Sequence, residues 1–144
     1  MRKRLQLLLA ICWLLVLPLS PAVWGEGTRL LVVTSTQGIG PLSRKQIKQI
    51  YLESSTGYPV KPINLAAGAK IRSIFNARII GLTESRIQAY WAQRRFTGRS
   101  SPPMEFESIE ALMQFLETNS GYLAYLPDSV SLPETLEVVY SFDY

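Results

Sequence analysis

The sequence contains no histidine and one cysteine, Cys12, which lies in the apolar stretch near the N-terminus. Ser–His and Cys–His nucleophile pairs, the usual zinc sites and an intramolecular disulfide are therefore excluded. A carboxylate pair could still hydrolyse glycosides, and the nearest candidates are Glu105 and Glu107 beside a proline-rich loop. Solvated charge is the ordinary role of such residues. We predict no catalytic residue, no metal site, no cofactor and no enzymatic activity.

The N-terminus has the pattern of a secretory signal peptide. Basic residues 2–4 precede an apolar run over 5–19, which is shorter than the roughly 20 residues of a membrane-spanning helix. Two prolines break the run, and small residues follow at Ala22 and Gly25, after either of which cleavage is expected. An uncleaved membrane anchor is the alternative. A lipoprotein is disfavoured, because the residue before Cys12 is not small.

The predicted cleavage divides the chain into a signal peptide at 1–25 and one exported domain at 26–144. The whole chain carries 15 Lys and Arg against 11 Asp and Glu, a net charge of +4. The signal takes three cations and no acid with it, which leaves 12 cations against 11 acids, a balance of +1. This balance gives no reason to expect a nucleic-acid partner.

Short apolar strands alternate with amphipathic helices along the predicted domain, which indicates an α/β layered fold with one core. Helix starts are marked by a capping box at Ser43 and Gln46, and by capping residues at Thr83 and Ser108. A further helix follows a turn at Gly68 and ends at Gly81. The expected strands cover 29–34, 62–67, 121–126 and 136–140.

The turn formed by Ala67, Gly68, Ala69 and Lys70 is a candidate anion site. It joins a predicted strand to a helix, and the free N–H groups of a helix N-terminus attract anions. Lys70 and Arg72 lie in the first helical turn, where cations oppose the helix dipole unless an anion is bound. Two solvated cations, at a small cost in free energy, explain the pattern equally well.

Two further groups of side chains are weaker candidates. Ser35 and Thr36 follow the first strand, where ligands often bind in α/β folds, although hydroxyls are common in loops. Basic and aromatic residues also alternate near position 95, as in surfaces that bind acidic ligands or stack on bases. We prefer aromatic core residues overlaid by arginines as the interpretation of this group, which comprises Trp91, Arg94, Arg95, Phe96 and Arg99.

Several short motifs follow one another in a characteristic order, at 42–43, 49–52, 62–65, Phe75, 90–91, 96–98, 102–103 and 121–125. This order resembles that in the solute-binding proteins of phosphate ABC transporters, most of all their short, single-lobe members. The resemblance runs from about Leu31 to Leu126. It implies one lobe of a type 2 periplasmic-binding-protein fold, with a small mixed sheet flanked by about four helices, and a periplasmic location.

The resemblance also implies a ligand-binding turn, from which this chain departs. In phosphate binders the turn has an arginine, then Gly-Ser-Gly-Thr, and a phenylalanine four residues later. Aligned on Phe75, Gly68 keeps the first glycine, whereas Leu65, Ala69 and Ile71 replace the arginine, serine and threonine. Only backbone N–H groups, with Lys70 or Arg72, remain for an oxyanion, and full-sized relatives also close a second lobe over the solute.

Two hypotheses for function follow. The first is weak binding of phosphate or another small oxyanion, as an accessory to ABC transport or sensing, with a membrane transporter or a sensor protein as partner. Its ligand-binding residues are Ser35, Thr36, Ala67, Gly68, Ala69, Lys70 and Arg72. The second is a protein-interaction module that has the same fold without a ligand.

Overall fold

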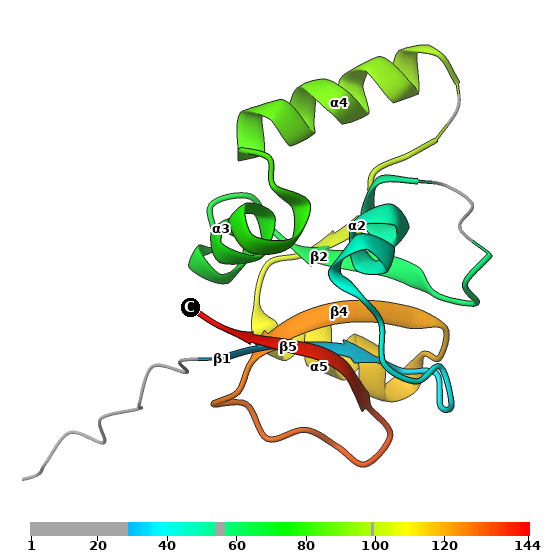
Figure 1. The fold of residues 1–144 in the computed structure, drawn as a ribbon, viewed down its shortest axis with the longest axis vertical. Helices are drawn as coiled ribbons and strands as arrows, with labels where there is room; N and C mark the ends of the chain where they lie inside the picture. The colour runs from blue at the N-terminus through cyan, green and yellow to red at the C-terminus, as the bar shows by residue number, and fades with distance from the viewer. Residues whose placement is uncertain (1–28, 54–56, 99) are drawn as a thin grey trace, which may run out of the picture.

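The structure is a computed structural model that describes residues 29–53, 57–98 and 100–144. The predicted signal peptide and its cleavage sites lie outside these residues. Five strands form one mixed sheet in the order β3-β2-β4-β1-β5 (Figure 1). The strands are β1 (Arg29–Thr34), β2 (Lys61–Leu65), β3 (Met104–Phe106), β4 (Tyr122–Pro127) and β5 (Glu137–Asp143).

The strand directions separate the two ends of the sheet. β2 pairs in parallel with both β3 and β4, while β1 is antiparallel to β4 and to β5. The carboxyl ends of β2, β3 and β4 therefore lie at one edge, and the carboxyl end of β1 lies at the opposite edge. This arrangement decides which of the predicted site residues can meet.

Four α-helices of the described residues flank the sheet, and their capping residues explain where three of them begin. The capping box of Ser43 and Gln46 is formed, and the side chains of Thr83 and Ser108 accept hydrogen bonds from the first helical turn. These three predicted starts are confirmed. The helices are α2 (Arg44–Leu52), α3 (Lys70–Phe75), α4 (Glu84–Phe96) and α5 (Ile109–Thr118).

The helices cover both faces of the sheet, because the side chains of a strand point alternately to opposite sides. On one face Tyr125 of β4 stacks on Phe75 of α3, with ring centroids 4.0 Å apart. On the other face Tyr122 of the same strand meets Phe115 of α5 edge-on at 4.8 Å. α2 and α3 share the first face, and α4 stands outside them (Figure 1).

Two local features were not predicted. β3 is an edge strand of three residues, two of them exposed, so it lacks the apolar alternation by which strands are recognised. The helix that follows Gly68 continues from α3 into a π-helical turn, η1 (Asn76–Ile80), before Gly81 ends it with φ 72°. A left-handed end of this kind favours glycine. No helix within 29–53, 57–98 or 100–144 is long and apolar enough to cross a membrane.

Candidate functional site

The turn around Gly68 lies at the carboxyl end of β2 and faces solvent. Ala67, Gly68 and Lys70 are exposed, and Ala69 is half-buried. Gly68 has φ 95°, a backbone conformation that is strained for any residue with a side chain. No atom would lie within 4 Å of a Cβ added there. The turn is closed by a hydrogen bond from the Ala69 N–H to the Ala66 carbonyl at 3.2 Å. Ala69 is the N-cap residue of α3 and provides no side-chain cap.

Arg72, two residues beyond the turn, has its guanidinium group inside the protein. The side chain is 2% exposed and donates two hydrogen bonds to Glu84, at 2.9 Å from Nε and 2.6 Å from Nη2. Its Nη1 atom donates to Glu105 and to the carbonyl of Leu65, both at 2.6 Å. These four bonds occupy four of the five N–H groups of a guanidinium. The anions that accompany this cation are therefore carboxylates of the protein itself.

Arg72, Glu84, Glu105 and the Leu65 carbonyl form an ion cluster that joins four elements around the turn. Leu65 ends β2, Arg72 belongs to α3, Glu84 begins α4 and Glu105 lies in β3. Glu84 also accepts hydrogen bonds from Asn76 of η1 at 2.9 Å and from Gln88 at 2.7 Å. The forked pairing of a guanidinium with a carboxylate fixes both groups in direction as well as distance. The cluster thus holds the end of β2 and the first turn of α3 in a set position.

The cluster shifts the pKa values of two of its members. Burial acts to lower the pKa of Arg72, but the hydrogen bonds and charges of Glu105 and Glu84 outweigh burial and raise it. Burial acts to raise the pKa of Glu84, but hydrogen bonds from Gln88 and Arg72, together with the Arg72 charge, lower it. Both groups are ionised at neutral pH. One cation and two carboxylates leave a net negative charge beside the Gly68 turn.

The sheet is split at the same edge, between β2 and β4. The two strands pair only at Lys61–Tyr122 and Pro62–Leu123. Further along, the Tyr51 hydroxyl donates to the carbonyls of Ile63 at 2.9 Å and Leu123 at 3.3 Å, in place of ladder hydrogen bonds.

Tyr125 continues the same arrangement. Its buried hydroxyl accepts a hydrogen bond from the Leu65 N–H at 3.4 Å and donates to the Asn64 side chain. Burial raises the pKa of Tyr51 and of Tyr125, so both hydroxyls stay protonated. The carboxyl ends of β2 and β4 are therefore held apart by buried hydroxyl groups.

This split coincides with a reversal in strand order. The chain passes from β2 to β3 on one side, and from β4 by way of the last loop to β5 on the other. A crevice at the carboxyl ends of two parallel strands, where the connections leave in opposite directions, is the usual ligand position in open α/β sheets. The Gly68 turn lies beside this point.

Ser35 and Thr36 lie at the other edge of the sheet. Their hydroxyls accept hydrogen bonds from the N–H groups of Tyr122 and Gly121, both at 3.1 Å, at the start of β4. Ligands often bind beyond the carboxyl end of a strand. That rule would place Ser35 and Thr36 near the Gly68 turn only if β1 were parallel to β2. β1 is antiparallel to β4, which is parallel to β2. The structure therefore does not bring the seven predicted residues into one site.

The interleaved basic and aromatic residues near position 95 are partly separated. Trp91 is buried, whereas Phe96 is 94% exposed at the end of α4. The guanidinium of Arg94 lies 5.4 Å from the ring centre of Tyr90 and donates to Ser100 at 2.7 Å. Trp91 is thus a core residue as expected, whereas Phe96 is not, and the ring beneath Arg94 is that of the half-buried Tyr90. Arg99 lies outside the described residues.

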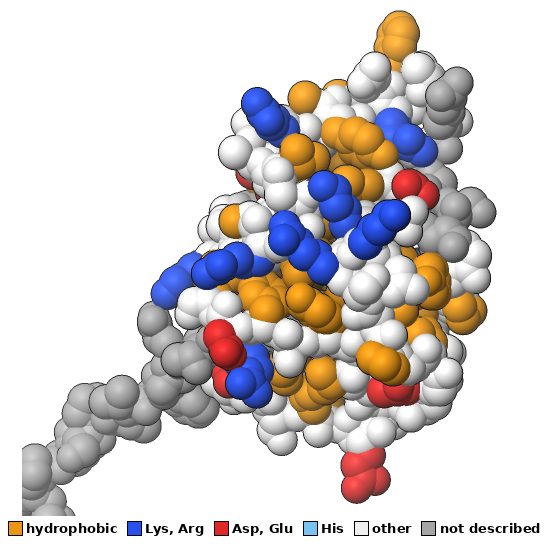
Figure 2. Space-filling view, in the orientation of Figure 1, with side chains coloured by type: hydrophobic (Ala, Val, Ile, Leu, Met, Phe, Trp, Pro, Cys, Tyr) orange, Lys and Arg blue, Asp and Glu red, His pale blue; other side chains and the backbone are white. Residues whose placement is uncertain are grey.

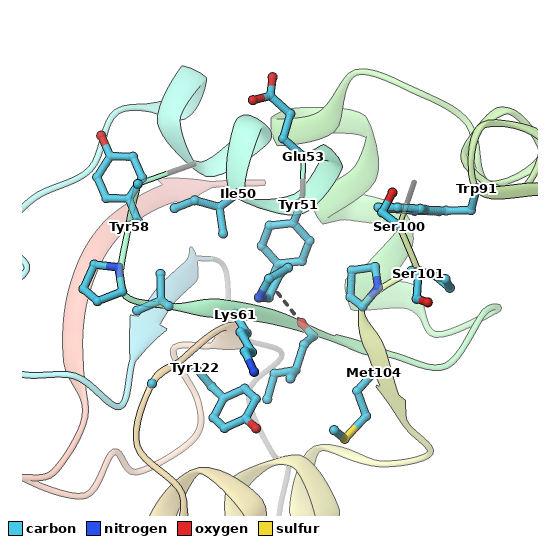
Figure 3. Close-up of a pocket in the computed structure, with 18 of the residues that line it drawn as sticks. Ile50, Tyr51, Glu53, Tyr58, Lys61, Trp91, Ser100, Ser101, Met104 and Tyr122 are labelled. Carbon is cyan, nitrogen blue, oxygen red and sulfur yellow. Dashed lines mark hydrogen bonds between the residues drawn. The ribbon is translucent and has the colours of Figure 1, made fainter. Parts of the chain in front are cut away.

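A groove of about 1020 Å³ opens at the amino ends of β2 and β4. Figure 3 shows Tyr51 above it and Tyr122 and Met104 below it, with Lys61 between them. Lys61 is the one cation among the described residues that line it. Its other labelled residues are Ile50, Glu53, Tyr58, Trp91, Ser100 and Ser101.

No group of three or more potential metal ligands occurs in the part of the chain that the structure describes. Within that part, every buried side-chain nitrogen and oxygen atom has a hydrogen-bond partner. No buried polar atom therefore depends on a ligand. Sequence analysis missed Glu84 as the partner of Arg72. The visible signal was an acid directly after the capping residue Thr83, which is common at helix starts and does not identify its partner.

Comparison with known proteins shows which solved structure this fold is similar to. No family model matches the sequence, and no curated protein matches it significantly. The chain is similar in structure to an ABC-type phosphate transport receptor from Vibrio cholerae, with a TM-score of 0.56 at 16% identity. The match covers 79% of this chain and 45% of the receptor.

The fold is a single periplasmic-binding-like lobe. The expected fold class, with a mixed sheet and four flanking helices, is confirmed. In this lobe the Gly68 turn lies at the carboxyl edge, and the aromatic ring of Phe75, at the end of α3, packs against the rings of Tyr51 and Tyr125. The chain spans less than half of the receptor, so the likeness concerns one lobe only.

Proposed function

We propose that this chain is an exported, non-enzymatic, solute-binding-like protein whose Gly68 turn holds phosphate or another small oxyanion weakly. The observation that carries the proposal is the exposed, uncapped turn beside the strand-order reversal of a periplasmic-binding-like lobe. The proposed role is that of an accessory to ABC transport or to sensing in the periplasm, with a membrane transporter or a sensor protein as partner.

The backbone of the turn supplies the proposed contacts. Ala67, Gly68 and Ala69 are small enough to let an oxyanion approach the main chain, and Lys70 provides an exposed cation next to it. N–H groups at the start of a helix favour negative charge. Ser35 and Thr36 are too far along the sheet to contribute, and Arg72 is bound to Glu84 and Glu105.

The electrostatics explain why the proposed binding is weak. The carboxylates of Glu84 and Glu105 are 34% and 41% exposed and exceed the charge of Arg72 by one. A solvated anion at this turn therefore meets a negative neighbour, and no side-chain ligand except Lys70 offsets it. A dissociation constant of about 1 mM, equivalent to about −4 kcal/mol, is the expected order.

The test is a titration of the protein with phosphate and sulfate, followed by the amide resonances of the turn. We expect the N–H signals of Gly68 and Lys70, on either side of the bonded Ala69 N–H, to shift together with one dissociation constant. A control titration with chloride at equal ionic strength removes general salt effects. Shifts spread evenly over the surface, or none at the turn, would reject the solute-binding proposal.

A matched pair of substitutions at the N-cap sharpens this test. Ala69→Asp places a carboxylate over the free N–H groups, so it should stabilise the protein by about 0.5–2 kcal/mol and abolish anion binding. Ala69→Ser provides a similar cap without charge and should bind more anion than Ala69→Asp does. If all the N–H shifts are absent and a periplasmic extract yields a specific protein partner, the interaction-module hypothesis replaces the first.

A further inference from the structure

The charges of this chain are segregated along the sequence. Residues 101–144 carry eight Asp and Glu and no Lys or Arg. α2 and the continuous helix of α3 and η1 contain cations and no acid. The one acid of α4, Glu84, is bound to Arg72 and Asn76. The helices on one side of the sheet are therefore basic, while the last third of the chain is acidic.

The helices on this side of the sheet carry five exposed cations that we call the basic face: Arg44, Lys45 and Lys48 of α2, Arg78 of η1 and Arg86 of α4. The tips of Lys48 and Arg44 lie 3.9 and 4.0 Å from the position of a Cβ on Gly81. Arg44 also donates to the Ile79 carbonyl at 3.5 Å. α2 and the end of η1 are thus in contact, and Lys and Arg gather over this side in Figure 2.

None of these five cations forms a salt bridge with a carboxylate of the described residues. Arg44 and Lys48 are four residues apart on one helix, where like charges repel and cost a few tenths of a kcal/mol. The sheet and the helices beneath them are already held by a buried core. The basic face therefore contributes nothing to the fold that would account for its single sign.

The chemistry of the face indicates the kind of partner. Specific protein interfaces centre on buried aromatic or aliphatic anchors, and the described large exposed apolar residues are Phe96, Met104 and Val138, none of them on α2 or η1. A face of long, solvated cations without an anchor suits a broad anionic surface. Phe96 stands at the far end of α4, beyond Arg94 and Arg95, where an aromatic ring can enter the interface of a bilayer.

We propose that the basic face binds the surface of an anionic phospholipid bilayer, with Phe96 as an apolar contact at its rim. The acidic last third of the chain is repelled by the same surface, so the domain is held in one orientation. Lipid headgroups are attracted by each exposed Lys or Arg near them, and the attraction decays within a Debye length. This inference concerns a different surface from the Gly68 turn and does not rest on the proposed solute binding.

The test is co-sedimentation of the full chain with phosphatidylcholine vesicles, with and without a large share of phosphatidylglycerol. The decisive comparison uses two triple variants of equal net charge. Arg44→Gln, Lys48→Gln and Arg78→Gln remove three cations from the basic face. Exposed positions elsewhere take three acids in the control, which combines Gln114→Glu, Ser129→Glu and Ser141→Glu.

The first variant should lose affinity for phosphatidylglycerol vesicles on the order of a hundredfold, while the control should retain most of it. Apolar insertion of the N-terminal segment is common to both and cancels in the comparison. Phe96→Ser should weaken binding to a smaller extent. The chain without substitutions should release the vesicles as salt is raised.

Three outcomes overturn the proposal. Equal losses in the two triple variants would show that only net charge matters. Equal binding to phosphatidylcholine vesicles would show that anionic lipid is not recognised. Binding of a duplex oligonucleotide that depends on the basic face, with vesicle binding that does not, would assign the face to nucleic acid instead. The oxyanion titration of the first triple variant, read at Gly68, separates these results from the solute-binding test.

Discussion

Arg72 and Arg44 each lie in the first turn of a helix, yet their surroundings are opposite. The guanidinium of Arg72 is buried and bound to two carboxylates and a carbonyl. Arg44 is exposed, and one carbonyl at 3.5 Å is its described hydrogen-bond partner. The sequence pattern is nearly the same in both places. The difference shows that a cation near a helix start becomes available to a ligand only when the tertiary structure brings no carboxylate to it.

The largest difference in stability is expected when each guanidinium is removed in turn. Arg72→Met leaves Glu84 and Glu105 close together without a cation, and breaking a buried ion pair costs about 3–5 kcal/mol. We expect about 3 kcal/mol, because both carboxylates are partly exposed and can be rehydrated. Arg44→Met should change the free energy of unfolding by less than about 0.5 kcal/mol. Urea unfolding measures both, and similar losses would contradict the contrast.

Acid should destabilise the protein by protonating Glu84, the partner of Arg72. The pKa of Glu84 is lowered in the folded state, so its contribution to stability is complete above the unfolded value of about 4.5. It is lost as the pH falls from there through the folded pKa. Glu84→Gln should therefore be less stable at neutral pH and lose less stability between about pH 5 and pH 2. Parallel acid-unfolding curves for the two proteins would show that Glu84 is not the titrating group.

The same carboxylates set the affinity expected at the Gly68 turn. Removing one charge about 10 Å from a solvated anion changes its binding by about 0.4 kcal/mol, or about twofold. Glu105→Gln should therefore bind phosphate about twofold more tightly in the amide titration. Glu117→Gln, exposed near the end of α5 toward the other edge of the sheet, is the control and should have a smaller effect. An unchanged affinity in Glu105→Gln would place the anion elsewhere.

The smallest effect on stability is expected from a substitution on the basic face. Lys48→Glu replaces the repulsion between Lys48 and Arg44 by attraction at the same spacing, which should raise the free energy of unfolding by about 0.3–0.5 kcal/mol. Thermal unfolding at low and high salt measures this gain, since salt should reduce it. The same change should weaken vesicle binding. A loss of stability would mean that Lys48 has a structural partner.

Much of the fold was predictable because its signals are local. The capping residues Ser43, Thr83 and Ser108 mark helix starts by their own hydrogen bonds, and β1 has an uninterrupted apolar run. β3 was missed because its pairing with β2, and not its own pattern, makes it a strand. The π-helical turn after Phe75 likewise has no local signature.

The candidate site was less predictable, since it depends on contacts between distant residues. Anion binding at the exposed Gly68 turn stays a prediction. The turn itself was predicted from its sequence. Its charge balance was not, because Glu84 and Glu105 reach Arg72 across 12 and 33 residues of the chain. The direction of β1, which places Ser35 at the opposite edge from the Gly68 turn, is also set by partners that lie some ninety residues away in the sequence.

The position of β1 has a consequence for biosynthesis. This strand is made before every other described element, yet its two neighbours in the sheet, β4 and β5, are the last to be made. A nascent chain therefore exposes an unpaired apolar strand until almost the whole domain has left the ribosome, since early pairing partners do not exist. Thr34 cannot align with Leu123 before that point. The sheet of this domain can therefore be completed only when synthesis is nearly finished.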